Sequence, residues 1–192
     1  LPFLWRAWLD ALLPRWAEIT QGRLADDVAR PALDHPGLAR LAALRTERDG
    51  KLVMRDCVLG LVTGEVALLG RLEEVDVRFN WHDPQFVREG LAWKRALNAF
   101  PFAVPLAESY KRSRLKRPRD QLFERIDAWR ESSSIGRRGA THDAWHLPTA
   151  AARFLNLAAA AAWLDFGPSD SDRGWYGRLL ALHAVYLDRH RT

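Results

Sequence analysis

The sequence predicts a mainly α-helical protein, a single-domain helical bundle with one short β element near residues 72–81. The helical prediction rests on apolar residues that recur every three or four positions along most of the chain, as on the buried face of a helix. The β element rests on strict alternation, because every second side chain from Val75 to Trp81 is apolar and polar residues separate them. A length of 192 residues without a fixed-period repeat suits one domain, residues 1–192.

The first half of the sequence predicts short helices separated by turns. Residues 3–19 show the spacing of an amphipathic helix, which Pro14 kinks or divides. Another short helix is expected over residues 38–44. Residues 51–72 also keep a helical period, and we predict a helix there, although the glycines of this stretch are also compatible with the turns of a hairpin. These glycines are Gly60, Gly64 and Gly70.

The second half predicts longer helices. Asp83 and Pro84 supply an acidic cap and a proline at the first helical position, so a helix should start there and continue to Phe100. The proline-bounded stretch 101–105 is predicted to be a connection. The inward-facing residues of the predicted helix are Phe86, Val87, Leu91 and Leu97.

Four further helices are expected after this connection. The first spans residues 106–116, and the second starts at Pro118. A third, alanine-rich helix spans residues 148–166, and the last spans residues 175–190 after a polar loop. The predicted buried side of the second helix consists of Leu122, Phe123, Ile126 and Trp129.

The excess positive charge is concentrated in residues 108–139, which we call the basic segment. It holds ten Lys and Arg residues against five Asp and Glu, and this excess of five equals the formal net charge of +5 for the whole protein. Six of the nine residues from Lys111 to Arg119 are cationic. Such a block repels itself unless a polyanion or an acidic protein surface neutralises it.

We interpret the basic segment as the nucleic-acid-binding surface of a non-catalytic subunit, as would suit a larger nucleoprotein assembly with other protein subunits. Arginine outnumbers lysine eight to two, which favours bidentate contacts with phosphate. Tyr110, Phe123 and Trp129 lie among the cations, as in proteins that stack bases. The partner would be DNA or RNA, and an acidic protein partner is the alternative. The predicted contact residues are Lys111, Arg112, Arg114, Lys116, Arg117, Arg119, Arg137 and Arg138.

Residues 141–146, THDAWH, suggest a second kind of site. His142 and His146 are four residues apart, and on a helix this spacing places two side chains on one face, where they can bind a metal. With Asp143 between them, the pattern resembles the H-E-x-x-H motif of zinc hydrolases, and the resemblance implies a metal-dependent hydrolase. The alternative is two polar histidines at a helix entrance. We adopt the alternative, and no bound metal is expected.

Two arginine–histidine pairs offer another enzymatic interpretation. Arg137 with His142, and Arg178 with His183, resemble the R-x4-6-H motif of HEPN-type helical ribonucleases. The resemblance implies an arginine and a histidine that flank the scissile phosphate. His183 also lies among apolar residues of the last predicted helix, which favours a core histidine. No Walker A, GxGxxG or GxSxG motif is present, so no cofactor is expected.

The cysteine content and the apolar runs bear on the compartment. The single cysteine, Cys57, excludes an internal disulfide and is typical of a protein from the reducing cytoplasm. The longest apolar run, near residues 158–164, is much shorter than the roughly 20 residues that span a bilayer. We therefore expect a cytoplasmic protein without a membrane partner.

Overall fold

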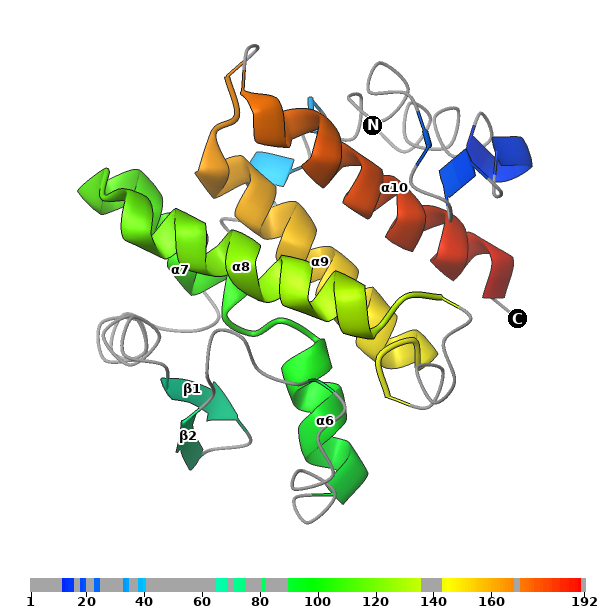
Figure 1. Cartoon of the computed structure of the whole chain (residues 1–192), viewed down its shortest axis with the longest axis horizontal. Helices are drawn as coiled ribbons and strands as arrows, with labels where there is room; N and C mark the ends of the chain where they lie inside the picture. The colour runs from blue at the N-terminus through cyan, green and yellow to red at the C-terminus, as the bar shows by residue number, and fades with distance from the viewer. Residues whose placement is uncertain are drawn as a thin grey trace.

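Helices dominate the part of the chain that the computed structural model describes (Figure 1). The helices are α6 (Gly90–Asn98), α7 (Ala103–Ser113), α8 (Lys116–Ser132), α9 (Leu147–Leu164) and α10 (Ser171–His190), with a 3-10 turn η1 (Leu13–Arg15). The mainly helical prediction is therefore confirmed. The structure describes residues 12–15, 18–19, 23–24, 33–34, 38–40, 65–68, 71–74, 81, 90–135, 143–167 and 170–190.

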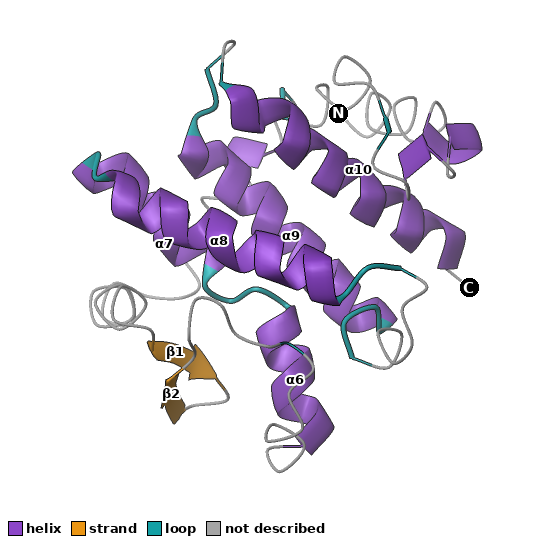
Figure 2. Ribbon diagram, in the orientation of Figure 1, coloured by secondary structure: helices purple, strands orange, loops and turns teal. Residues whose placement is uncertain are grey.

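Two short strands, β1 (Glu65–Leu68) and β2 (Arg71–Glu74), form an antiparallel hairpin that lies beside α6 and below α7 and α8 in Figure 2. Leu68 pairs with Arg71, so only two residues join the strands, a length typical of tight hairpins. The helix predicted over residues 51–72 is wrong within β1 and at the start of β2. Glycine weakens a helix, and strand pairing satisfies the backbone instead.

The β element predicted near residues 72–81 is only partly covered by the described residues. Its first three positions belong to β2. Residues 75–80, which carry the alternating pattern, lie outside the described part of the chain. The element therefore stays a prediction.

Helix α9 lies at the centre of the helical assembly. It packs against α6, α7 and α10, and Figure 1 shows it between α8 and α10. Four successive alanines in its second half, Ala158 to Ala161, are buried. Because these side chains are small, neighbouring helices can approach the α9 backbone closely. None of the described helices combines the length and apolarity needed to cross a membrane.

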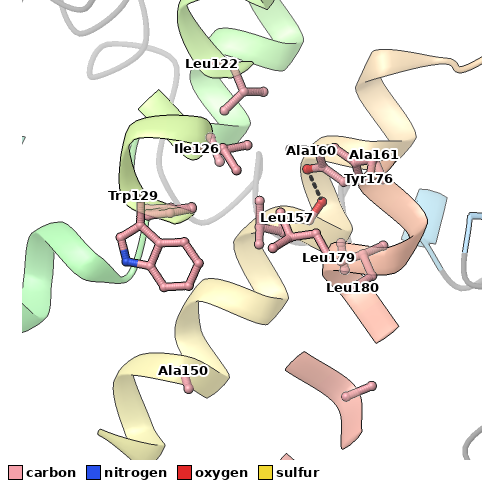
Figure 3. Packing of buried hydrophobic residues seen from close by; sticks show 14 of the residues in the cluster. Leu122, Ile126, Trp129, Ala150, Leu157, Ala160, Ala161, Tyr176, Leu179 and Leu180 are labelled. Carbon is pink, nitrogen blue, oxygen red and sulfur yellow. Dashed lines mark hydrogen bonds between the residues drawn. The ribbon is translucent and has the colours of Figure 1, made fainter. Parts of the chain in front are cut away.

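The core is formed where α8, α9 and α10 meet (Figure 3). Tyr176 of α10 lies in this core, and its hydroxyl donates a hydrogen bond of 2.8 Å to the Leu157 carbonyl of α9. The buried side predicted for the helix after Pro118 is confirmed. Leu122, Ile126 and Trp129 are buried, and Phe123 is partly buried and packs against the same cluster.

Two predictions around α6 and α7 need correction. Leu91 was expected to face inward but its side chain is 47% exposed, whereas Leu97 is buried as predicted. Phe86 and Val87 lie outside the described residues. The stretch 101–105 is not simply a connection, because α7 already begins at Ala103. Pro105 is the third residue of α7, where the backbone nitrogen needs no intrahelical hydrogen bond.

The last two helices follow the predicted order. The alanine-rich prediction over residues 148–166 is confirmed by α9, and Pro148 lies in its first turn. Helix α10 begins at Ser171, four residues before the predicted start. The reason is Asp170, whose carboxylate accepts a hydrogen bond of 3.0 Å from the backbone N–H of Asp172 and so caps the helix.

Candidate nucleic-acid interface

The turn between α7 and α8 positions the first six predicted contact residues. Lys111 and Arg112 lie in the last turn of α7, Arg114 follows its end, and the other three lie at the start of α8. In Figure 2 this turn lies at the left-hand end of the paired helices. Arg137 and Arg138 lie outside the described residues. The structure therefore brings Lys111, Arg112, Arg114, Lys116, Arg117 and Arg119 into one region.

Local hydrogen bonds set the angle of the turn. Arg114 has a left-handed backbone (φ 60°), and its N–H donates to the Tyr110 carbonyl at 2.8 Å. The Ser113 hydroxyl donates to the Ser109 carbonyl at 2.7 Å and accepts from the Leu115 N–H at 3.2 Å. Leu115 is extended, and α8 starts directly after it. The polar groups at the end of α7 thus fix a two-residue connection.

The two cations in the last turn of α7 have partners within the protein. Lys111 forms an ion pair with Asp165, which ends α9. Hydrogen bonding from Lys111, and then its charge, lower the pKa of the Asp165 carboxyl, and the charge of Arg114 adds to this effect. Arg112 forms an ion pair with Glu108 one turn earlier on α7.

The Glu108 carboxylate is itself buried, with its residue 1% exposed. Burial raises the pKa of Glu108, and the nearby Arg112 opposes this effect. Arg112 is thus oriented by a buried carboxylate, which needs a nearby cation to offset its negative charge. The i, i+4 spacing of Glu108 and Arg112 is the sequence signal that indicates this ion pair.

Arg119 connects α8 to the start of α10. One of its terminal nitrogens donates to both Asp170 oxygens, at 2.6 and 2.8 Å, and contacts Asp172 at 3.0 Å. Its guanidinium carbon lies 5.2–5.9 Å from the ring centroids of Tyr110, Phe123 and Phe166. The Arg119 side chain is only 20% exposed. It therefore stabilises the fold rather than presenting its charge to a partner.

The remaining cations form a compact exposed group, Arg114–Arg117, which we call the exposed corner. Arg114, Lys116 and Arg117 are all exposed, and no ion pair joins them to a carboxylate within the described ranges. Leu115, between them, is 64% exposed. Three cations on four consecutive residues, without paired carboxylates, form a surface suited to an anionic partner.

The metal-site interpretation is not supported by the local geometry. Asp143, Ala144 and Trp145 form a turn, and His146 precedes the first residue of α9 instead of lying inside a helix. The His146 ring nitrogen Nδ1 lies 3.3 Å from the Thr149 hydroxyl. His142 lies outside the described residues. Within the described ranges, no three metal-binding side chains are grouped together.

The second arginine–histidine pair does not form a surface site. His183 is fully buried, and its partner is Arg153, thirty residues earlier, a pairing that no local sequence pattern indicates. A ring without exposure cannot contact a phosphate of a bound strand. Arg137 and His142, the first pair, lie outside the described residues.

Comparison of the chain with protein-family models, with curated proteins and with solved structures gave no match. The interpretation of the site therefore rests on its geometry and charge.

Proposed function

We propose that this chain is a non-catalytic nucleic-acid-binding subunit, in which the exposed corner contacts the phosphate backbone. The proposal rests on one observation, the three exposed cations Arg114, Lys116 and Arg117 at a fixed turn without carboxylate partners among the described residues. Arg137 and Arg138 of the same basic segment would add further contacts. The chain has a single cysteine, which is typical of a cytoplasmic protein, and the proposed subunit would act within a larger assembly.

The charge distribution favours a polyanion. Outside the basic segment, positive and negative side chains are equal in number, so the rest of the chain carries no net charge. Two arginines at the corner can make bidentate contacts with phosphate oxygens. Each phosphate that they neutralise releases condensed counterions from the nucleic acid, and this release drives binding at low salt.

The internal ion pairs reduce the number of contacts expected. Lys111, Arg112 and Arg119 are held by carboxylates, so three cations of the corner remain. At about 0.9 per contact, the three contacts of the corner contribute about −2.7 to the slope of log affinity against log salt on duplex, and Arg137 and Arg138 would add to it. On a single strand, at about 0.7 per contact, the contribution of the corner would be about −2.1.

The first prediction removes the three charges of the corner. A variant with Arg114→Gln, Lys116→Gln and Arg117→Gln should bind weakly to every sequence, and its salt slope should be flatter by about 2 to 3 units. Its stability should change little, because exposed charges contribute little to folding. Fluorescence anisotropy with labelled single- and double-stranded DNA and RNA, over a range of salt concentrations, measures both quantities.

A matched control removes the same number of positive charges from other parts of the chain. Arg23→Gln, Arg40→Gln and Lys94→Gln together lower the net charge by three and leave the corner intact. This variant should keep most of the salt slope of the parent protein. Equal losses in both variants would mean that binding follows net charge alone, and the corner would not be the site.

The alternative partner is an acidic protein surface. If the parent protein binds none of the four nucleic acids at low salt, the nucleic-acid proposal fails. An acidic partner would then be sought with the same corner variant. A nuclease assay on the same RNA tests the ribonuclease alternative, because a non-catalytic subunit should leave the strand intact.

A further inference from the structure

Arg153 of α9 is a buried cation in the core. Its residue is 0% exposed, and no carboxylate pairs with it within the described part of the chain. Nη1 donates to the Asn98 carbonyl at the end of α6, at 2.8 Å, and to the Ala144 carbonyl at 2.7 Å. Nε donates to Nε2 of His183 on α10, at 2.7 Å. The Arg153 side chain thus joins three separate parts of the chain.

Aromatic rings surround this hydrogen bond. The guanidinium carbon of Arg153 lies 4.2 Å from the ring centroid of Trp129 and 5.0 Å from that of Trp145. The His183 ring stacks on Trp145, with centroids 5.1 Å apart. Trp129 in turn donates from Nε1 to the Asn98 side chain at 2.8 Å. The π faces and the two carbonyls take the place of a counter-ion.

The hydrogen bonds define the protonation state of His183. Arginine only donates hydrogen bonds, so Nε2 of His183 must be the acceptor and carry no proton. Its other nitrogen, Nδ1, lies 2.8 Å from the Leu179 carbonyl and donates to it. His183 is therefore neutral. Burial, and then the charge of Arg153, lower the pKa of His183 well below its ordinary value.

Arg153 keeps its own charge in this setting. Burial lowers the pKa of Arg153 to about 9, which is still above neutral pH. The pair therefore carries one positive charge at pH 7, and a second proton would place two cations in hydrogen-bond contact. A like charge at this distance in a dry core is strongly unfavourable.

We propose that the Arg153–His183 hydrogen bond is an acid-sensitive switch, which opens the junction of α6, α8, α9 and α10 when His183 takes up a proton. Protonation converts Nε2 from an acceptor into a donor, so Arg153 loses a partner and is repelled. The groups that Arg153 holds, the Asn98 and Ala144 carbonyls, lose their partner in the same step. The switch does not depend on the function proposed above.

Among the described residues, no other ionisable group near the pair forms an ion pair with it. From α10, the Tyr186 hydroxyl donates to the Trp145 carbonyl, and burial raises the pKa of Tyr186, so this side chain stays neutral. Asp143, in the turn before α9, accepts from the Ala144 N–H at 2.6 Å. Among the described residues, α8 contributes Trp129 and α6 contributes the neutral Asn98.

The direction of the pH effect follows from the neutral state of His183. Since the pKa of His183 is lower in the folded protein than in the unfolded chain, the unfolded chain takes up the proton first as the pH falls. Stability is therefore lost below about pH 6.5, the ordinary value for histidine, at up to about tenfold in the unfolding equilibrium constant per pH unit.

The carboxyl groups of Asp165 and Glu108 also make stability depend on pH, but in a different pH range or in the opposite direction. The pKa of Asp165 is lowered, so its contribution to stability is lost only as the pH falls below its ordinary value of 3.8. The pKa of Glu108 is raised, so acid favours the folded state at this residue. Both groups are shared by all variants of the test, and their effects cancel in the comparison.

The second prediction uses His183→Gln, because the glutamine amide oxygen can accept from Arg153 but takes up no proton. Urea unfolding of parent and variant should be measured between pH 7.5 and pH 5. From about pH 6.5 to 5.5, the unfolding constant of the parent should rise by about fivefold more than that of the variant, because the unfolded-state histidine is already half protonated at pH 6.5. His190→Gln, at the exposed end of α10, is the matched control and should behave like the parent.

Equal pH dependence of the parent and His183→Gln would overturn the switch. If His183→Gln does not fold, histidine NMR of the parent protein decides. The His183 ring should remain neutral in the folded protein as the pH is lowered through 6.5, and its signals should shift only when the protein unfolds. Titration of this ring in the intact fold near pH 6.5 would contradict the proposal.

Discussion

Arginine side chains in this protein combine charge with contact to aromatic rings. Arg119 lies near three rings, Arg125 lies over Phe102, and Arg130 lies over Trp175. The planar, weakly hydrated guanidinium can be buried against a ring more easily than an ammonium can. An arginine in the basic segment is therefore as able to join the core as to contact phosphate.

The third prediction tests the structural role of Arg119. Arg119→Gln should lower the free energy of unfolding by about 1 to 3 kcal/mol, because Asp170 loses its partly buried partner and the three rings lose the guanidinium. Arg119→Lys should recover part of this loss, since it restores the charge without the planar group. Urea denaturation measures both variants. An unchanged urea midpoint for Arg119→Gln would show that Arg119 does not stabilise the fold, and its role as a predicted phosphate contact would stand.

At the scale of elements, Asp170 has two roles at the start of α10. Its carboxylate caps the helix through the Asp172 N–H and also accepts from Arg119 of α8. The cap starts the helix, and the ion pair fixes its direction relative to α8. Negative charge is also favourable at a helix N-terminus.

The fourth prediction separates these roles by substitution. Asp170→Asn keeps a good capping side chain but removes the charge, whereas Asp170→Ala removes both. Alanine should cost about 1 kcal/mol more than asparagine in urea unfolding, the ordinary loss from a missing cap. In the Arg119→Gln background, the cost of Asp170→Asn should shrink, because the ion pair is already absent. Equal costs in both backgrounds would show that the ion pair contributes nothing measurable.

Local sequence patterns define some elements of this fold and leave others open. The buried face of α8 was predictable, because Leu122, Ile126 and Trp129 follow the helical period along one segment. The hairpin was not, since the apolar spacing of residues 51–72 also suits a helix and only strand pairing decides between them. The starts of α7 and α10 differ from the predicted starts. In α7 a proline is tolerated in the first turn, and in α10 an aspartate caps the helix earlier than predicted.

The candidate site was predictable in position but not in composition. The sequence places six cations between Lys111 and Arg119, and the structure brings them to one turn. Which of them remain exposed depends on Asp165 and Asp170, about fifty residues later in the chain. Pairings across that separation are set by packing, and no local pattern indicates them. The Arg153–His183 contact likewise joins two helices and has no local signal.

At the scale of the whole molecule, charge and apolar burial are separated along α8. Its first turn carries two of the three exposed cations of the corner, Lys116 and Arg117, and its later turns face α9 and α10 through buried residues. Substitutions in the exposed corner should therefore leave the core intact, as long as the core residues contribute most of the free energy of unfolding. Leu157 of α9 lies where α8, α9 and α10 meet (Figure 3).

The fifth prediction tests this separation with two leucines of the same helix. Leu157 is fully buried, whereas Leu155 is 40% exposed. Leu157→Ala should lower the free energy of unfolding by about 2 to 5 kcal/mol, because it removes buried apolar surface and leaves a cavity between three helices. Leu155→Ala carries the same change in helix propensity and should cost well under half as much, since its side chain already contacts water. Urea unfolding compares the two variants, and nucleic-acid binding by Leu155→Ala should match the parent. Similar costs at both positions would mean that the junction of α8, α9 and α10 is not the stabilising centre of the fold.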